Sequence, residues 1–353
     1  MSVLDSPPLY EQLDPSGMLQ HLRRFPEQCR RAWDNSARLR LPPAYATVNK
    51  VVISGMGGSA IGGDFIRRLA AIENSVPVGI HRDYGLPPFV DGNTLLIFSS
   101  YSGNTEETLS CFAESLNTEA RKLVITTGGK LKEMARQEGL PVLTIDYTSP
   151  PRAAFPHSFV SLLGVFNALG LIRDKTADLQ EASQVLEAVS RDANEDLPAA
   201  SNPAKQLALD FHGHLAVVYG AGLLTEVAQR WKTQINENSK AWAFHETLPE
   251  LNHNSVVGYQ FPAEVGARTM VVLLHSSLIH QRVSVRYRLT QEILARQGVK
   301  HKAVEATGRG ALAQMLGMVL LGDYVSLYLA ILNRVDPTGV AQIDYLKSRL
   351  SQS

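Results

Sequence analysis

The sequence predicts a doubly wound α/β fold, in which parallel strands alternate with helices that cover both faces of each sheet. Short apolar runs at 50–54 and 94–99 are separated by stretches with helical periodicity, and a glycine-rich turn at 55–59 follows the first run. The same order of strand, glycine-rich turn, helix and strand starts again near residue 215. Because strands that alternate with helices form parallel sheets with buried faces, two such sheets are expected.

Length and composition limit the class of protein. The chain has 353 residues, which favours two domains, and its 44% hydrophobic and 19% charged residues are typical of a soluble globular protein. Lys+Arg and Asp+Glu both total 34, so no net charge favours binding to nucleic acid or to an anionic membrane. The two cysteines, Cys29 and Cys111, form neither a disulfide framework nor a zinc knuckle. A reducing cytoplasm is the expected compartment.

The apolar segments predict neither a secretory signal nor a membrane span. The first residues lack the basic start and apolar run of a signal peptide. The longest apolar segment, around 315–332, is interrupted by Asp323 and is predicted to be a buried helix.

The expected elements fall into three parts: a peripheral helical extension at 1–45, a first domain at 46–195 and a second domain at 196–353. Pro26 interrupts the extension and two prolines at 42–43 close it. In the first domain we expect strands at 50–54, 94–99, 121–126 and 142–145. We expect one helix from the end of the glycine turn at 59 through about 69, and others at 105–117, 129–138, 153–171 and 178–194. In the second we expect strands at 215–219, 270–274 and 301–305, and helices at 223–240, 280–297, 310–333 and 339–350.

The segment 99–108 carries the strongest functional signal. It joins a buried strand to a helix start, and its hydroxyl groups surround a glycine. Such a loop can bind a phosphate dianion, because unpaired amides and the helix dipole favour an anion there. Asn104 is expected to cap the helix, with Glu107 completing a capping box. The alternative is a capped hydrophilic turn, but a cap needs one hydroxyl and this loop offers several: Ser99, Ser100, Ser102 and Thr105.

The glycine turn after the first strand suggests a second interpretation. Residues 55–60 match the GxGxxA form of the dinucleotide-binding fingerprint, and Asp83 follows at a distance suited to a ribose contact. A nicotinamide-dependent oxidoreductase is therefore an alternative function. Gly62 and Gly63 lie inside the predicted helix, where close packing explains them at least as well as a ligand does. Ser59, at the helix start, is the better candidate for a ligand contact.

Other motifs give no metal site or nucleophile. His212 and His214 have no third ligand near them in the sequence, and His245-Glu246 lacks the HExxH spacing. The sequence contains no GxSxG elbow and no Walker A lysine after the glycines. We expect neither a metal nor a cofactor.

The two loops together, GMGGSAIGGD at 55–64 and SSYSGNTEET at 99–108, resemble the sugar isomerase (SIS) domain, a flavodoxin-like α/β fold that binds phosphosugars. From about residue 50 to the C-terminus the chain is similar to the bifunctional phosphoglucose/phosphomannose isomerase family, which has two SIS domains. The motifs that narrow the match are Pro151-Arg152-Ala153, Asn236-Glu237-Asn238, Pro249-Glu250-Leu251-Asn252-His253-Asn254, Asp336-Pro337-Thr338 and Leu346-Lys347. Gly339 stands where the family pattern has a second proline.

The resemblance implies a metal-independent isomerase that interconverts glucose 6-phosphate and mannose 6-phosphate with fructose 6-phosphate through a cis-enediol, in glycolysis and gluconeogenesis. It implies Glu237 as the proton-shuttling base, His253 as a ring-opening group supplied across a homodimer interface, and Lys347 as its partner in ring opening. Arg152 would stabilise the enediolate charge. The implied phosphate contacts are Ser100, Ser102 and Thr105, and the implied sugar contacts are Gly57, Gly58, Ser59 and Thr338.

Spacing alone favours a plainer interpretation of these residues. On the helix at 223–240, Glu237 shares a polar face with Glu226 and Arg230, as expected of a solvated surface. His253 would then order a loop, and Lys347 would be an ordinary helix lysine. A non-catalytic, regulatory phosphosugar-binding protein is the corresponding alternative function.

Overall fold

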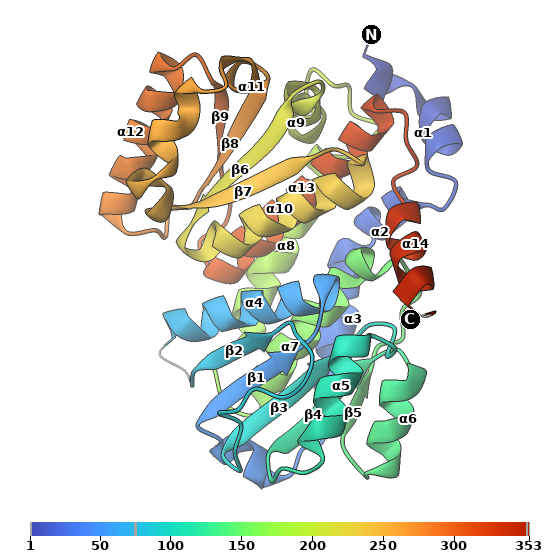
Figure 1. Ribbon diagram of the computed structural model, residues 1–353. Coiled ribbons are helices and arrows are strands. Elements are labelled where there is room, and N and C mark those ends of the chain that lie inside the picture. The colour runs from blue at the N-terminus through green and yellow to red at the C-terminus, as the bar shows by residue number, and fades with distance from the viewer. Residues whose placement is uncertain (1, 74–75, 351, 353) are drawn as a thin grey trace. The chain divides into compact units, whose positions relative to one another are not determined.

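The computed structural model describes residues 2–73, 76–350 and 352 (Figure 1). The chain divides into two compact units. We call Arg24–Gln180 the first-sheet unit, and Met1–Arg23 together with Glu181–Ser353 the second-sheet unit. Each unit contains one parallel sheet, which confirms the predicted α/β class.

The first-sheet unit is a five-stranded parallel sheet in the order β2-β1-β3-β4-β5, covered by helices on both faces (Figure 1). Every residue of β3 is buried, which explains its unbroken apolar run. The strand order reverses between β1 and β3, and ligands bind at such switch points in open α/β sheets. The strands are β1 (Lys50–Ser54), β2 (Val78–His81), β3 (Thr94–Ser99), β4 (Arg121–Thr126) and β5 (Val142–Thr144), and the helices are α3 (Phe25–Ser36), α4 (Gly57–Ile72), α5 (Glu106–Ser115), α6 (Gly129–Gln137) and α7 (Phe155–Ala168).

The second-sheet unit repeats this arrangement with four parallel strands in the order β7-β6-β8-β9. Helix α10 packs on one face of the sheet with α13 packed against it, and α12 covers the other face (Figure 1). The strands are β6 (Leu215–Ala221), β7 (Ala243–Leu248), β8 (Thr269–His275) and β9 (Lys300–Glu305). The helices are α1 (Pro7–Leu13), α2 (Met18–Arg23), α9 (Pro203–Phe211), α10 (Thr225–Ser239), α11 (Ala263–Ala267), α12 (Gln281–Arg296), α13 (Ala311–Leu332) and α14 (Ala341–Leu350), while α8 (Thr176–Asp192) spans the division between the units.

Helix α13 is the buried helix that the sequence predicts. Its length and composition would suit a membrane span, but nearly all of its apolar side chains are buried inside the unit. A Cβ at Gly322 would clash with the indole ring of Trp231, so only glycine lets this ring from α10 approach. The indole N–H donates to the main-chain oxygen of Met318 (2.8 Å).

Two strands are missing from the sequence prediction, β2 and β7. Each follows the helix after the first strand of its sheet, β2 after α4 and β7 after α10, and each lies at a sheet edge. Strand β2 pairs Val78 with Val51 of β1, and β7 pairs Ala243 with Ala216 of β6. Edge strands are covered on fewer sides, and no residue of β2 is fully buried. Their sequences mix polar and apolar residues, and so they lack the apolar run that identifies β1 and β3.

The division of the chain differs from the expected domain boundaries. Residues 1–45 do not form one separate layer: α3 packs on α7 in the first-sheet unit, whereas α1 and α2 pack on α13. The ring of Tyr10 meets that of Tyr328 edge to face at 6.1 Å. The second-sheet unit already begins at Glu181, whose carboxylate accepts a hydrogen bond from Gly310 N (3.1 Å).

Close packing accounts for the two glycines inside α4. A Cβ at Gly62 would lie 3.1 Å from the main-chain nitrogen of Phe159 in α7. A Cβ at Gly63 would lie 2.9 Å from the Ile80 side chain of β2. The packing interpretation of Gly62 and Gly63 is thus confirmed, with no need for a ligand at either residue.

One buried histidine should make stability depend on pH. His157 of α7 stacks on Tyr147 with ring centroids 4.8 Å apart, and burial lowers the pKa of His157 to about 4. The positive charge of Arg31 lowers this pKa further, whereas Asp146 raises it. The unfolded chain binds a proton near pH 6.5, so this contribution to stability is present above that pH and is lost toward pH 4.

We therefore expect His157→Phe, which retains the ring stack, to flatten the fall in unfolding free energy between pH 7.5 and pH 5. The wild-type protein should lose about 2 kcal/mol more than the variant over this interval. Urea unfolding at the two pH values measures the difference, with exposed His253→Phe as the matched control. Equal losses in the wild type and the His157 variant would contradict the assignment.

Candidate active site

The glycine turn after β1 and the hydroxyl-rich loop after β3 lie side by side in the first-sheet unit. Tyr101 N donates a hydrogen bond to Ser59 Oγ (3.1 Å). A Cβ at Gly55 would lie 2.6 Å from the main-chain oxygen of Ser99, so glycine is required for this approach. The two loops therefore meet at the carboxyl ends of neighbouring strands, at the switch point of the sheet.

The three hydroxyl groups predicted to bind phosphate come from one compact loop. Ser100 is buried, and its Oγ lies 2.8 Å from Thr105 Oγ1 and accepts a hydrogen bond from Gly103 N (3.2 Å). Ser102 is exposed, and its Oγ accepts from Asn104 N (3.2 Å). Gly103 has φ +67°, and a Cβ there would clash with the main-chain oxygen of Gly128. Only glycine can therefore form this loop, which ends at the N-terminus of α5.

The predicted capping box at Asn104 and Glu107 is wrong. Helix α5 begins at Glu106, and Thr105 occupies the N-cap position without a side-chain cap hydrogen bond. Asn104 Oδ1 accepts instead from Lys130 N at the start of α6 (3.1 Å). The loop packs against the turn before α6. The side chain of Asn104 is therefore hydrogen-bonded to α6 and does not cap α5 as its local spacing predicts.

Arg152 lies on a turn that packs against the start of α4, where the glycine turn ends. It belongs to the short 3₁₀ turn η3 (Pro151–Ala154), and it is only 4% exposed although arginines are mostly found at protein surfaces. A Cβ at Gly58 would lie 3.2 Å from the main-chain oxygen of Pro151, and Ser158 Oγ donates to Gly58 O (3.1 Å). The start of α4, which includes Gly57 and Ser59, is thus in direct contact with the turn that carries the arginine. An arginine, several hydroxyl groups and a helix N-terminus together suit an anionic ligand.

The corresponding loop of the second-sheet unit is filled by protein groups. Strand β8 also ends in serines, but Ser276 Oγ donates to Gln314 Oε1 (2.5 Å) and Gln314 Nε2 donates to Ser277 Oγ (2.8 Å). Gln314 belongs to α13 and is fully buried. The two sheets are therefore similar in topology, but the second loop uses its hydroxyl groups inside the protein.

Glu237 lies in the last turn of α10, and it is half-buried. The prediction of a solvated polar face is wrong for two of its members, since Glu226 and Arg230 are both buried. Helix α13 covers this face, and Arg230 Nη2 lies 2.6 Å from Asp323 Oδ2. A buried ion pair can replace water around an arginine, which periodicity alone does not reveal.

The end of α10 is fixed by contacts that the sequence reasoning missed. Asn238 Nδ2 donates to Ser326 Oγ (2.9 Å), and Ser239 Oγ donates to Ser326 O (2.7 Å). Lys240 takes a left-handed conformation with φ 53°, and its ammonium donates to the main-chain oxygens of Glu237 (2.6 Å) and Pro337 (3.3 Å). The segment 336–338, which carries the half-buried Thr338, therefore lies beside the turn that carries Glu237.

His253 and Lys347 belong to the second-sheet unit and both are exposed. His253 ends the 3₁₀ turn η5 (Glu250–His253), and Lys347 lies on α14, which has no buried residue. Their roles stay predictions. The expected site residues thus come from both units: the hydroxyl loop, the glycine turn and Arg152 from the first, and Glu237, His253, Thr338 and Lys347 from the second.

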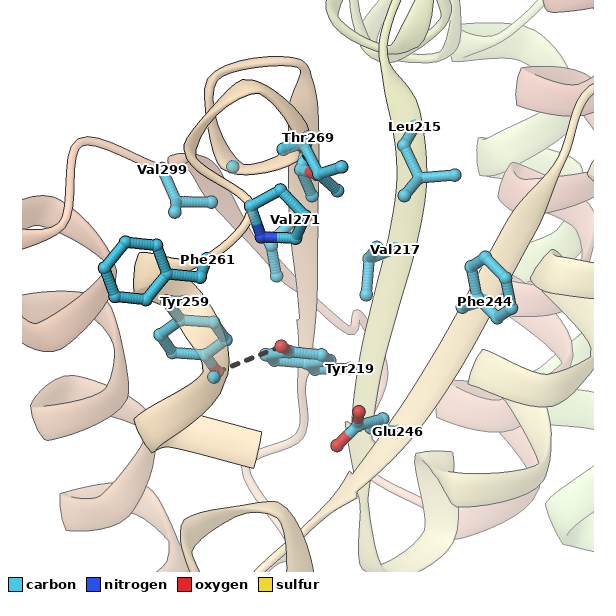
Figure 2. A pocket seen from close by; sticks show the side chains of 14 residues that line it. Leu215, Val217, Tyr219, Phe244, Glu246, Tyr259, Phe261, Thr269, Val271 and Val299 are labelled. Carbon is cyan, nitrogen blue, oxygen red and sulfur yellow. Dashed lines mark hydrogen bonds between the residues drawn. The ribbon is translucent and has the colours of Figure 1, made fainter. Parts of the chain in front are cut away.

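A cavity of about 230 Å³ opens on the second sheet, but it contains none of the predicted site residues (Figure 2). It lies between β6, β7 and β8 and the segment 258–266. The hydroxyl groups of Tyr219 and Tyr259 are 3.0 Å apart, and burial raises the pKa of both phenols. Its lining is mainly apolar, with the Glu246 carboxylate as its charged group and no lysine or arginine, so it does not suit a phosphate.

Within the described ranges, no group of three or more His, Cys, Asp or Glu side chains is placed to hold a metal ion. In the dinucleotide-like turn, protein contacts explain Gly55, which Ser99 approaches, and Gly58, which Pro151 approaches. Gly57 has φ +49°, which favours glycine, and a Cβ there would meet no atom within 4 Å. Asp83 is exposed, and its carboxylate accepts a hydrogen bond from Tyr84 N (2.8 Å).

Comparison with known proteins identifies the family. Residues 200–350 match the model of the bacterial phospho-glucose isomerase C-terminal SIS domain. A bifunctional phosphoglucose/phosphomannose isomerase from Caldicellulosiruptor bescii is 40% identical, over 95% of this chain and 99% of the relative. The Aquifex aeolicus protein of the same name is 37% identical, over 86% of this chain and 90% of the relative.

A solved structure supports the fold. The crystal structure of a glucose-6-phosphate isomerase like protein from Thermus thermophilus aligns with a TM-score of 0.63 at 19% identity, covering 99% of both chains. The identity and coverage of the relatives, together with the two adjacent loops of the first-sheet unit, lead to one conclusion: the chain belongs to the bifunctional phosphoglucose/phosphomannose isomerase family.

Proposed function

We propose that this protein interconverts glucose 6-phosphate and mannose 6-phosphate with fructose 6-phosphate through a cis-enediol, without a metal ion. Family membership supports the reaction. The observation that carries the proposal is the contact between the hydroxyl-rich loop, the glycine turn and buried Arg152, all in one unit. A sugar phosphate needs this combination, because its dianion must be held while charge develops on neighbouring oxygens.

Binding and charge stabilisation are the roles of the first-sheet unit. Ser100, Ser102 and Thr105 bind the 6-phosphate, and each charge-assisted hydrogen bond contributes about 1.5–3 kcal/mol. Held by its phosphate, the open-chain sugar has its reacting carbons fixed in place, which is a proximity effect. Arg152 stabilises the enediolate oxygen, since a preorganised cation acts most strongly on charge that develops in the transition state. The sugar contacts are Gly57, Gly58, Ser59 and, from the second-sheet unit, Thr338.

Proton transfer and ring opening are the roles of the second-sheet unit. Glu237 moves one proton between C2 and C1, and its fixed position at the end of α10 supports this role. His253 and Lys347 open the ring. The exposure of His253 supports its delivery to the active site of a second copy in a homodimer. The reaction is cytoplasmic and belongs to glycolysis and gluconeogenesis.

The test is direct incubation of purified, EDTA-treated protein with fructose 6-phosphate. We expect both glucose 6-phosphate and mannose 6-phosphate to form, at a rate that added Mg²⁺ or Zn²⁺ does not raise. Nuclear magnetic resonance identifies the products and their ratio. A rate that vanishes after EDTA and returns with one metal ion would contradict the metal-independent mechanism.

The same incubation separates the alternatives. A regulatory phosphosugar-binding protein would bind fructose 6-phosphate, measured by calorimetry, and form no product. A nicotinamide-dependent oxidoreductase would bind NAD, which calorimetry with NAD measures in the same way.

A further inference from the structure

Tyr101, the aromatic residue of the hydroxyl-rich loop, makes hydrogen bonds to three other segments of the first-sheet unit, and phosphate binding does not explain them. Its main-chain nitrogen donates to Ser59 Oγ (3.1 Å), and its main-chain oxygen accepts from Thr127 N (3.1 Å) and Thr127 Oγ1 (2.7 Å). Its phenol reaches a third segment: the OH donates to Tyr147 O (2.6 Å) and accepts from Ser149 N (2.9 Å). The side chain thus fixes the backbone at 147–149, while the main chain fixes the two loops.

The backbone at 147–149 leads directly to Arg152. Pro150 and Pro151 follow Ser149, and proline rings fix φ near −65°, so the connection is stiff. Pro150 O accepts hydrogen bonds from Ser149 Oγ (3.0 Å) and from Ala153 N (2.9 Å), which adds to its rigidity. If Ser149 moves, Arg152 should therefore move with it by a similar distance.

We propose that Tyr101 is a positioning residue, whose phenol couples the phosphate-binding loop to Arg152 and so sets the position of the guanidinium over the reacting carbons. This inference rests on the proposed function. The Arg152 turn is held from its other side by Gly58, through the approach of Pro151 to α4. The phenol holds the Arg152 turn at a fixed position relative to the phosphate-binding loop. The groups that bind the phosphate and the group that stabilises the developing charge therefore keep a constant separation.

Tyr101→Phe removes the phenolic oxygen and leaves the main-chain contacts with Ser59 and Thr127 in place. Ser149 N then loses its acceptor, and Tyr147 O loses its donor. We expect kcat for fructose 6-phosphate to fall about 10- to 100-fold, because a misplaced catalytic group is costly in the transition state. The KM should stay within about twofold, because the phosphate hydroxyls are unchanged.

The matched control is Tyr45→Phe. Tyr45 is a buried tyrosine of the same unit, and its OH also donates to a main-chain oxygen, that of Lys122 (2.9 Å). Both variants should lower the thermal unfolding midpoint by similar amounts, but Tyr45→Phe should keep the wild-type kcat. A fall in kcat shared by both variants would attribute the effect to general stability and overturn the inference.

A double-mutant cycle with Arg152→Met isolates the coupling. If Tyr101 acts through the arginine, Tyr101→Phe should change kcat less than about twofold once Arg152 is methionine, so the two effects are not additive. Additive effects, or a raised KM with unchanged kcat, would overturn the inference. Absence of turnover in the wild-type protein would overturn the proposed function instead, so the two failures are distinguishable.

Discussion

Glu237→Gln should lower kcat for the isomerisation of fructose 6-phosphate by about 10²- to 10⁴-fold, which is the range that a positioned general base contributes. Glutamine has nearly the size and shape of glutamate, but its amide cannot accept the proton that must leave C1 or C2. The contacts of Asn238 and Ser239 with Ser326 do not involve the side chain at 237, so the end of α10 should keep its structure.

Kinetics and isotope exchange measure this effect separately. In D₂O, the wild-type protein should incorporate solvent deuterium into the sugar at C1 or C2, and the variant should not. The control is Glu246→Gln, which changes another half-buried carboxylate of the same unit, one that binds Ser255 and has no proposed role in the reaction. Unchanged turnover in the Glu237 variant would contradict the mechanism and favour a regulatory, non-catalytic protein.

The central strands and the phosphate-binding loop can be predicted because their physical causes are local. Strands β1 and β3 are buried on both faces, so each reads as one apolar run. The loop at 99–105 follows β3 and carries its own hydroxyl groups and its own left-handed glycine, Gly103. Nothing outside these short segments is needed to recognise them.

The failed predictions have tertiary causes. Spacing assigns Asn104 to a helix cap, but the turn before α6 takes its side-chain oxygen. Periodicity assigns Arg230 to a solvated face, but α13 covers that face and supplies Asp323. The division of the N-terminal residues between two units depends on which later helix each early helix meets. Sequence periodicity shows that a residue is polar. It does not show which distant segment supplies the partner for its hydrogen bonds or its charge.

The roles of single residues are the least accessible to spacing. Glu237 and Lys347 look like ordinary helix residues in the sequence, and only the family motifs draw attention to them. The structure adds a physical reason for Glu237, since its turn is fixed by Asn238, Ser239 and Lys240. The flanking residues of that motif are therefore explained by positioning rather than by direct chemistry.

The buried pair of Arg230 and Asp323 should have the largest effect on stability. Both side chains are about 2% exposed, and the guanidinium joins α10 to α13. Asp323→Ala removes one partner of this buried ion pair, so we expect the free energy of unfolding to fall by about 3–5 kcal/mol. The exposed pair of Arg288 and Glu292 provides a control, and Glu292→Ala should cost about 0.5 kcal/mol or less.

A double variant distinguishes charge burial from simple loss of packing. Arg230→Met combined with Asp323→Leu removes both charges and keeps apolar volume, so it should recover most of the stability lost by Asp323→Ala. Urea unfolding followed by tryptophan fluorescence reports on this helix pair directly, because Trp231 of α10 packs on Gly322 of α13. If the double variant is as unstable as the single one, the loss reflects packing at α10 and α13, and the ion pair is not its cause. Asp323 lies one turn before Ser326, which holds the Glu237 turn, so Asp323→Ala should also lower kcat at temperatures where the protein is still folded.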